Sequence, residues 1–272
     1  MTPAAAVRLG RAVGIFSYYL VPLRKRTALN NLRIAFPEKS WRQRRRICRR
    51  TFANFGQTFF EFLRSPVRSP EELNQRVIFH GRALLYQAQQ SQRGTLLLTG
   101  HFGNWEIMAA AICNLGFPIT VIGKRQRNRL ADELINSYRR GVGIETVPLG
   151  MGLRQFLRAL KQNKFVAILA DQDAHREGVF VDFFNRPSAT APGVALLSLK
   201  TGAQIIFGTC VIGKKGRYTV YLEPIPSDGL SDDEQGIREL TQRHARRLEQ
   251  QIRRWPDHWF WMHKRWKTSP DD

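Results

Sequence analysis

One short turn of the sequence combines the residue types that acid–base catalysis requires. Residues 99–106 read TGHFGNWE after the apolar run TLLL, so His101 lies just past an expected strand and Glu106 in the first turn of the next helix. An imidazole can take a proton from a hydroxyl at neutral pH, and a carboxylate can hold its tautomer. We expect free backbone N–H groups around Gly103 and Asn104 to be available to an anion or oxyanion. The spacing is also compatible with a histidine satisfied by backbone and a glutamate favoured by the helix dipole.

A second polar run follows another apolar segment. The residues DQDAHR (171–176) place Asp171, Asp173 and His175 at alternating positions, where they could be read as metal ligands. Acid and histidine side chains that alternate from a strand end need not converge on one ion. We therefore expect no metal site, and expect this run to orient polar substrate groups or the base.

Short apolar runs alternate with helical patterns and supply the frame for both polar segments. The runs lie at 77–81, 95–100, 119–123, 146–149, 166–171, 204–213 and 218–225. This alternation predicts an α/β domain with a mostly parallel central sheet flanked by helices, in which the last two runs form a hairpin. Sites in such folds form at the carboxyl ends of strands, where His101 and Asp171 both lie.

The amino-terminal region does not follow this alternation. The apolar segment 12–23 has 12 residues, whereas a spanning helix needs about 20, so it is either an interfacial anchor or a buried first helix. We expect residues 1–70 to be a helical, basic and apolar membrane-associating region, and residues 71–272 to be an α/β domain continuous with it.

Within this region, residues 41–63 are expected to form an amphipathic helix. Its apolar stripe is Cys48, Phe52, Phe55, Phe59 and Phe62, and its basic residues near the start are Arg42, Arg45, Arg46 and Arg49. The stripe fits either packing in the core or membrane insertion, and the basic face is the one expected to meet an anionic surface.

The charge balance indicates an anionic partner. Forty-three Lys and Arg residues stand against 22 Asp and Glu residues, for a formal net charge of +21. Nucleic acid, an anionic membrane surface, or an acidic protein or phosphorylated substrate would all fit. The three cysteines form no CxxC pair and indicate reduced thiols rather than a disulfide or zinc framework.

Four segments together resemble one known family. HFGNWE fits the HxxxxD/E pattern of glycerolipid acyltransferases, and its flanks resemble the late acyltransferases of bacterial lipid A biosynthesis. Residues 28–40 (ALNNLRIAFPEKS), 171–206 and 258–268 (HWFWMHKRWKT) resemble that family's segments in the same order. The resemblance covers nearly the whole chain. It implies O-acyl transfer from acyl carrier protein or coenzyme A to a hydroxyl of a membrane glycolipid such as a lipid A precursor, with no cofactor and no covalent acyl-enzyme.

The resemblance also implies residue roles. His101 would be the general base and Glu106 its partner. The family pattern has an arginine four residues before an asparagine, but Lys124 precedes Asn128 here with Arg125 adjacent, and lysine lacks the bidentate guanidinium fork. The expected substrate-binding residues are Gly103, Asn104, Lys124, Arg125, Asn128, Asp171, Gln172, Asp173 and Arg176.

The resemblance further implies a peripheral or monotopic enzyme on the cytoplasmic face of the bacterial inner membrane. Its partners would be acyl carrier protein or acyl-CoA, the glycolipid acceptor and the anionic membrane surface, with no nucleic acid. Three alternatives remain open: a lysophospholipid or phosphoinositol glycolipid as acceptor, a thioesterase using the same dyad on water, and a basic nucleic-acid-binding protein, for which no recognised motif is present. The tryptophan-rich segment 255–266 is a membrane-interface belt, an acyl-chain wall or a core-closing segment.

Overall fold

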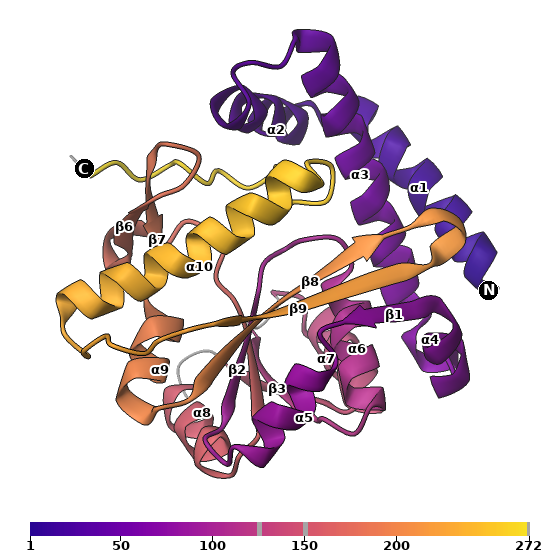
Figure 1. The fold of residues 1–272 in the computed structure, drawn as a ribbon. Helices are drawn as coiled ribbons and strands as arrows, with labels where there is room; N and C mark the ends of the chain where they lie inside the picture. Colours follow the sequence, from indigo (N-terminus) through magenta and orange to yellow (C-terminus); the bar gives the residue numbers. More distant parts are fainter. Residues whose placement is uncertain (124–126, 149–151, 271–272) are drawn as a thin grey trace.

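The computed structural model describes residues 1–123, 127–148 and 152–270, and a seven-stranded sheet lies at its centre (Figure 1). The strands of this sheet are β1 (Val77–His80), β2 (Thr95–Thr99), β3 (Ile119–Gly123), β4 (Ile144–Pro148), β5 (Phe165–Leu169), β8 (Gln204–Ile212) and β9 (Tyr218–Ile225). Their order is β1-β9-β8-β2-β5-β3-β4. All neighbours are parallel except β8 and β9, which pair as an antiparallel hairpin. The predicted mostly parallel α/β fold is confirmed.

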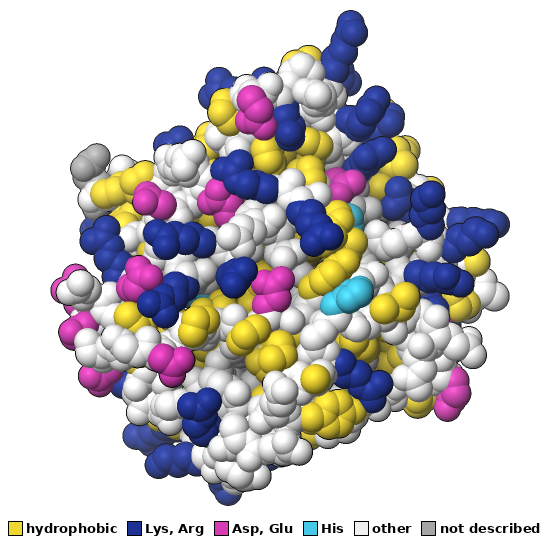
Figure 2. Space-filling view, in the orientation of Figure 1, with side chains coloured by type: hydrophobic (Ala, Val, Ile, Leu, Met, Phe, Trp, Pro, Cys, Tyr) yellow, Lys and Arg dark blue, Asp and Glu magenta, His cyan; other side chains and the backbone are white. Residues whose placement is uncertain are grey.

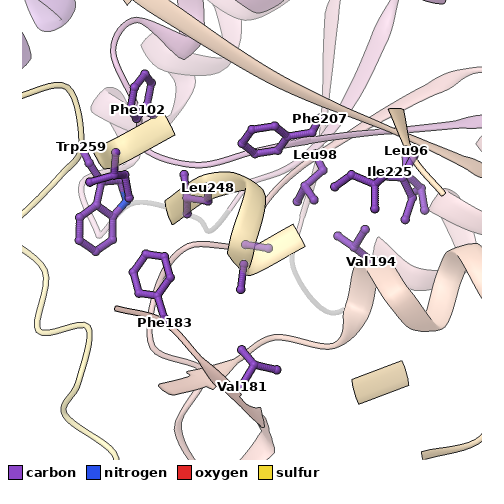
Figure 3. Close-up of a cluster of buried hydrophobic side chains, with 14 of the residues drawn as sticks. Leu96, Leu98, Phe102, Val181, Phe183, Val194, Phe207, Ile225, Leu248 and Trp259 are labelled. Atoms are coloured by element: carbon purple, nitrogen blue, oxygen red, sulfur yellow. The ribbon is translucent and has the colours of Figure 1, made fainter. Parts of the chain in front are cut away.

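Helices cover both faces of the sheet, which explains the continuous apolar runs. The helices of the sheet region are α5 (Ala83–Gln90), α6 (Trp105–Asn114), α7 (Arg129–Gly141), α8 (Gly152–Lys161), α9 (Gly193–Thr201) and α10 (Glu234–Arg254). Every residue of β2 is buried. Because side chains alternate along a strand, Leu96 and Leu98 pack with α8, α9 and α10, whereas Leu97 packs with α5 and α6. Figure 3 shows the first of these clusters, with Val194 and Phe207 beside Leu98.

Three helices at the amino terminus, α1 (Pro3–Leu20), α2 (Pro22–Ala35) and α3 (Trp41–Leu63), precede the short α4 (Pro70–Arg76). Glycines let α1 approach α3 closely: a Cβ on Gly14 would lie 2.1 Å from the Phe52 carbonyl oxygen. One face of α1 is therefore packed against the protein. The other face exposes Phe16 by 63% and Leu20 by 60%. No helix in the described ranges is both long and apolar enough to cross a bilayer.

The predicted helix 41–63 is present, but its apolar stripe is only partly in the core. It begins with a capping box between Ser40 and Gln43. Cys48 and Phe52 are buried, whereas Phe59 is 58% exposed. The buried face of the second half is polar instead, because it meets the turn after β2 and a buried cluster of ion pairs around Glu61.

A small antiparallel hairpin, β6 (Val179–Asp182) and β7 (Pro187–Thr190), was not predicted from the sequence. Its tight turn places Phe184 and Asn185 at φ values of 57° and 55°. Such turns usually carry Asn-Gly or Asp-Gly, so a phenylalanine there gives no sequence signal. The hairpin packs beside α10 (Figure 1).

Candidate active site

His101 lies just beyond the carboxyl end of β2, where its partner is Asp171. The imidazole Nδ1 is 2.8 Å from Asp171 Oδ1, and the His101 backbone N–H donates to Asp171 Oδ2 over 2.9 Å. The indole Nε1 of Trp259 donates to the same Oδ2, also over 2.9 Å. Asp171 is buried, and the His101 side chain is 26% exposed. One backbone and one side-chain contact thus fix His101 against a single carboxylate.

The electrostatics of the pair favour the charged carboxylate. Burial raises the pKa of Asp171, but the neighbouring His101 charge and the three hydrogen bonds outweigh it and hold this pKa below its usual value. Burial likewise lowers the pKa of His101, yet the Asp171 carboxylate, aided by Glu106, raises it above the ordinary histidine value. An ionised Asp171 accepts the Nδ1 proton and leaves Nε2 as the proton acceptor.

Glu106 does not make the contact that the sequence predicted for it. Its carboxylate Oε1 lies 2.5 Å from Arg139 Nη2 and accepts a hydrogen bond from Trp105 Nε1 over 3.2 Å. The expected pairing of His101 with Glu106 is therefore corrected: Asp171 holds the imidazole, and Glu106 acts on it through charge. Arg139 gave no signal in the sequence, since it is one of many arginines on a helix.

The turn after His101 is tightly bound to the body of the protein. The Gly103 N–H donates to the His258 carbonyl over 2.8 Å, and the Asn104 N–H donates to the Cys210 carbonyl over 3.2 Å. The Asn104 side-chain oxygen accepts from Ile107 N–H and caps α6. Gly103 has a φ of 57°, and a Cβ there would lie 1.7 Å from the Cys210 oxygen. The expectation of free amides at Gly103 and Asn104 is wrong; this turn positions His101.

Of the two predicted site residues that follow Asp171, one lines the cavity and the other contacts the carboxyl-terminal tail. Gln172 lines the same cavity as His101 and Glu106. Asp173 is buried, accepts a hydrogen bond from Thr268 Oγ1 over 2.9 Å, and donates its N–H to His263 Nε2 over 3.0 Å. It therefore anchors the carboxyl-terminal tail, a contact that does not reach the cavity.

Two more predicted residues lie away from the cavity lining, and two cannot be placed. Asn128 caps α7 by accepting from Ala131 N–H over 3.1 Å. Arg176 lies in an exposed single turn of helix. Lys124 and Arg125 lie outside the described residues. Within the described ranges, no three His, Cys, Asp or Glu side chains are arranged to hold a metal.

The cavity beside His101 has a polar end and a mostly apolar remainder. Its volume is about 650 Å³, within the range typical of ligand pockets. Near the carboxyl ends of the strands it is lined by Thr99, His101, Glu106, Arg139 and Gln172. The rest of the lining is mostly apolar, with Leu97, Met108, Ala109, Val121, Ile144, Ala167 and Ile168, and also includes the polar Asp132, Asn136 and Thr146. This lining suits a ligand that combines an apolar part with a polar group beside the imidazole.

The tryptophan-rich tail closes this site from one side. Phe260 N–H donates to the His101 carbonyl over 3.0 Å, and the Phe260 and His101 ring centroids are 6.0 Å apart. Trp259 and Trp261 are fully buried. Of the three interpretations of residues 255–266, the core-closing one describes these two side chains, and Trp259 adds a direct hydrogen bond to Asp171.

Comparison of the sequence with known proteins shows which family the chain belongs to. The family model described as bacterial lipid A biosynthesis acyltransferase matches residues 1–268. The chain belongs to this family. The lipid A biosynthesis myristoyltransferase of Escherichia coli (strain K12) is 27% identical over 267 residues, which cover 96% of this chain and 79% of that protein. The chain is thus an acyltransferase, and the predicted family resemblance is confirmed.

Other relatives extend the family beyond one acceptor. The lipid A biosynthesis acyltransferase of Haemophilus influenzae is 27% identical over 269 residues, covering 97% of this chain and 82% of the relative. The phosphatidylinositol mannoside acyltransferase of Mycolicibacterium smegmatis is 26% identical over 231 residues, covering 83% and 74%. The names of these relatives point to glycolipids of two kinds, and nothing in the match selects one of them.

Proposed function

We propose that this acyltransferase moves a fatty acyl group from an acyl thioester, on acyl carrier protein or coenzyme A, to a hydroxyl of a membrane glycolipid. The observation that carries the proposal is an imidazole held by a buried carboxylate beside a cavity with a polar end and a mostly apolar remainder. The names of the relatives support a glycolipid acceptor, either a lipid A precursor or a phosphoinositol glycolipid. No cofactor is needed for this chemistry.

The proposed reaction uses His101 as a general base. His101 Nε2 takes the proton of the acceptor hydroxyl while the hydroxyl oxygen attacks the thioester carbonyl. The carbon–sulfur bond then breaks, and the thiolate receives the proton from the imidazolium. Asp171 stabilises the imidazolium throughout, because its charge lies 2.8 Å from Nδ1. The acyl chain of the donor occupies the apolar part of the cavity.

We infer peripheral attachment to the cytoplasmic face of the inner membrane through α1 and α3. Apolar side chains on these helices are strongly exposed: Phe16 by 63%, Leu20 by 60% and Phe59 by 58%. Of these three, Phe59 lines a groove of about 400 Å³ between α1 and α3, whose lining is almost entirely apolar. Exposed apolar surface beside basic residues is typical of interfacial attachment.

The test is acyl transfer by His101→Ala. We expect it to lose most transfer of a labelled acyl group to lipid while its circular-dichroism melting curve is retained. Mass spectrometry of lipids from cells with and without the gene would identify the acceptor through a missing acyl group. Normal transfer by a folded His101→Ala protein would refute the mechanism, and thioester turnover that needs no lipid acceptor would favour a thioesterase.

A further inference from the structure

A second groove lies across the carboxyl-terminal tail from His101. It has a volume of about 830 Å³ and is formed by α2, the first turn of α3 and the segment around residues 264–267. Its basic lining residues, called here the groove cations, are Lys25, Arg26, Arg33, Arg44, Lys264 and Lys267. None of the described residues in its lining is acidic. In Figure 2, basic side chains are spread over the whole visible face, and several of them lie at the top of the molecule, where Figure 1 shows α2.

The groove cations are not neutralised by the protein itself. Among the residues that the structure describes, no carboxylate forms an ion pair with any of them. Arg33 donates to the Asn30 side-chain oxygen, Arg44 to the Phe36 carbonyl, and Lys25 lies over the Tyr18 ring. Six like charges around one hollow create a strongly positive potential, which an anion would relieve. Phosphate suits this mixture, since arginine binds it bidentately and lysine as a point charge.

The groove also has an apolar rim, which indicates an amphiphilic ligand. Trp41 is 54% exposed and Leu23 is 70% exposed, and both line the groove. The junction between α1 and α2 connects the two grooves. Val21 lines the apolar groove of about 400 Å³ between α1 and α3, and the next residue, Pro22, lines the basic groove. Exposed tryptophan is typical of the membrane interface. A headgroup in the groove would therefore keep its hydrocarbon chains on the apolar side.

Hydrogen bonds through the carboxyl-terminal tail connect the groove to His101. The Asn31 side-chain amide donates to the carbonyls of Trp261 (2.8 Å) and His263 (2.6 Å), fastening α2 to the tail. Phe260, one residue before Trp261, bonds the His101 carbonyl. Lys264 follows Phe260 by four residues, so their Cα atoms are at most about 14 Å apart. The groove and the contact to the His101 carbonyl therefore share one short stretch of the tail.

We propose that the groove cations bind the phosphate of a phosphorylated glycolipid headgroup and so present its sugar hydroxyl to His101. This inference rests on the proposed acyl transfer to a glycolipid. It places the anion site on α2, the first turn of α3 and the tail, with Arg44 rather than Arg42, Arg45, Arg46 and Arg49 among its cations.

The test measures binding of the full chain to three kinds of phosphatidylcholine vesicle. One carries a phosphorylated disaccharide glycolipid, one its dephosphorylated counterpart, and one enough phosphatidylglycerol to match the charge of the first. We expect tightest binding to the phosphorylated glycolipid, with little displacement by inorganic phosphate. Equal binding to the phosphorylated and dephosphorylated glycolipids, or to the charge-matched vesicles, would overturn the proposal, and full displacement by inorganic phosphate would indicate a site for free phosphate instead.

The matched variants separate local recognition from bulk charge. The groove variant is Arg33→Gln/Lys264→Gln/Lys267→Gln, and the control is Arg154→Gln/Arg158→Gln/Lys161→Gln on α8, which lies at the opposite end of the molecule (Figure 1). Both remove three exposed cations. Since exposed pairs contribute modestly one by one, we expect about tenfold weaker glycolipid binding for the groove variant and less than about twofold for the control. Equal losses, or no loss in a groove variant that melts normally, would refute the site.

A binding readout keeps this proposal separable from the catalytic one. His101→Ala is expected to bind the phosphorylated glycolipid as the native chain does, because it leaves the groove cations intact. Transfer that persists in His101→Ala would refute the proposed base and leave the groove result standing. Normal glycolipid binding by the groove variant would refute the groove and leave the base standing.

Discussion

Asp171→Asn is the most informative single change, because the two carboxylate oxygens have different partners. Oδ2 accepts from two donors, the His101 N–H and the Trp259 Nε1–H, whereas Oδ1 meets His101 Nδ1. An asparagine keeps more hydrogen bonds if its carbonyl oxygen replaces Oδ2. Its NH₂ group then faces Nδ1, and this forces the imidazole proton onto Nε2. The base would be blocked by its own proton.

The size of the effect follows from the loss of the charge-assisted hydrogen bond from His101 Nδ1–H to Asp171 Oδ1. A charge-assisted hydrogen bond, together with the cost of the wrong tautomer, amounts to about 3 kcal/mol, which corresponds to a rate on the order of 100-fold lower. The shape of the side chain is retained, so we expect the unfolding midpoint to change little by comparison. The assay is kcat/KM for acyl transfer, beside a thermal melt of each protein.

The same variant predicts a change in pH dependence. The base works in its neutral form, and Asp171 raises the pKa of His101. Activity of the native enzyme should therefore rise with pH through a His101 pKa that lies above the ordinary histidine value. Removing the charge removes the main cause of the raised pKa, so the acidic limb of kcat/KM should move to lower pH in Asp171→Asn while the plateau falls.

Glu106→Gln is the matched control that could refute this reasoning. Its carboxylate binds Arg139 and Trp105 rather than the imidazole. We expect a smaller loss of kcat/KM than in Asp171→Asn and a small shift of the acidic limb. If Glu106→Gln is the more damaging change, or if Asp171→Asn keeps most of its activity, Asp171 is not the partner that orients His101.

Three further predictions concern the fold and the attachment surface. Gly103→Ala should fail to fold or lose several degrees of melting temperature, because its Cβ would meet the Cys210 carbonyl oxygen. The control Gly193→Ala should melt normally, because a Cβ at Gly193 meets no described atom within 4 Å. Equal melting temperatures of the two variants would contradict the close approach at Gly103. Glu61→Gln should lower the free energy of unfolding by about 3–5 kcal/mol in urea titrations, since it removes the carboxylate that pairs with buried Arg68 and leaves Arg64 and Arg76 to share Glu72; a change within error would show that the Glu61 charge is dispensable. Phe16→Ser/Leu20→Ser should weaken vesicle sedimentation without lowering the melting temperature, because both side chains are exposed; unchanged sedimentation would exclude this face of α1 from attachment.

Much of the fold was predictable because its signals are local. The apolar run of β2 can be recognised from adjacent residues alone, and parallel pairing follows from the helices between the strands. The capping box at Ser40 likewise involves residues three apart. The exposed half of the α3 stripe was not predictable, because burial of that helix depends on the turn and the ion pairs it meets.

The sequence by itself determined that His101 follows one strand and that Asp171 follows another. It could not determine which carboxylate holds the imidazole, because Glu106 is five residues away and Asp171 seventy. The register of the sheet decides this: β2 and β5 are neighbours with Thr99 opposite Leu169, and His101 and Asp171 each follow that pair by two residues. The segments that follow β2 and β5 therefore leave the sheet side by side. Arg139, on α7, forms an ion pair with Glu106 instead. Pairing across the sheet is a long-range property that only the tertiary structure fixes.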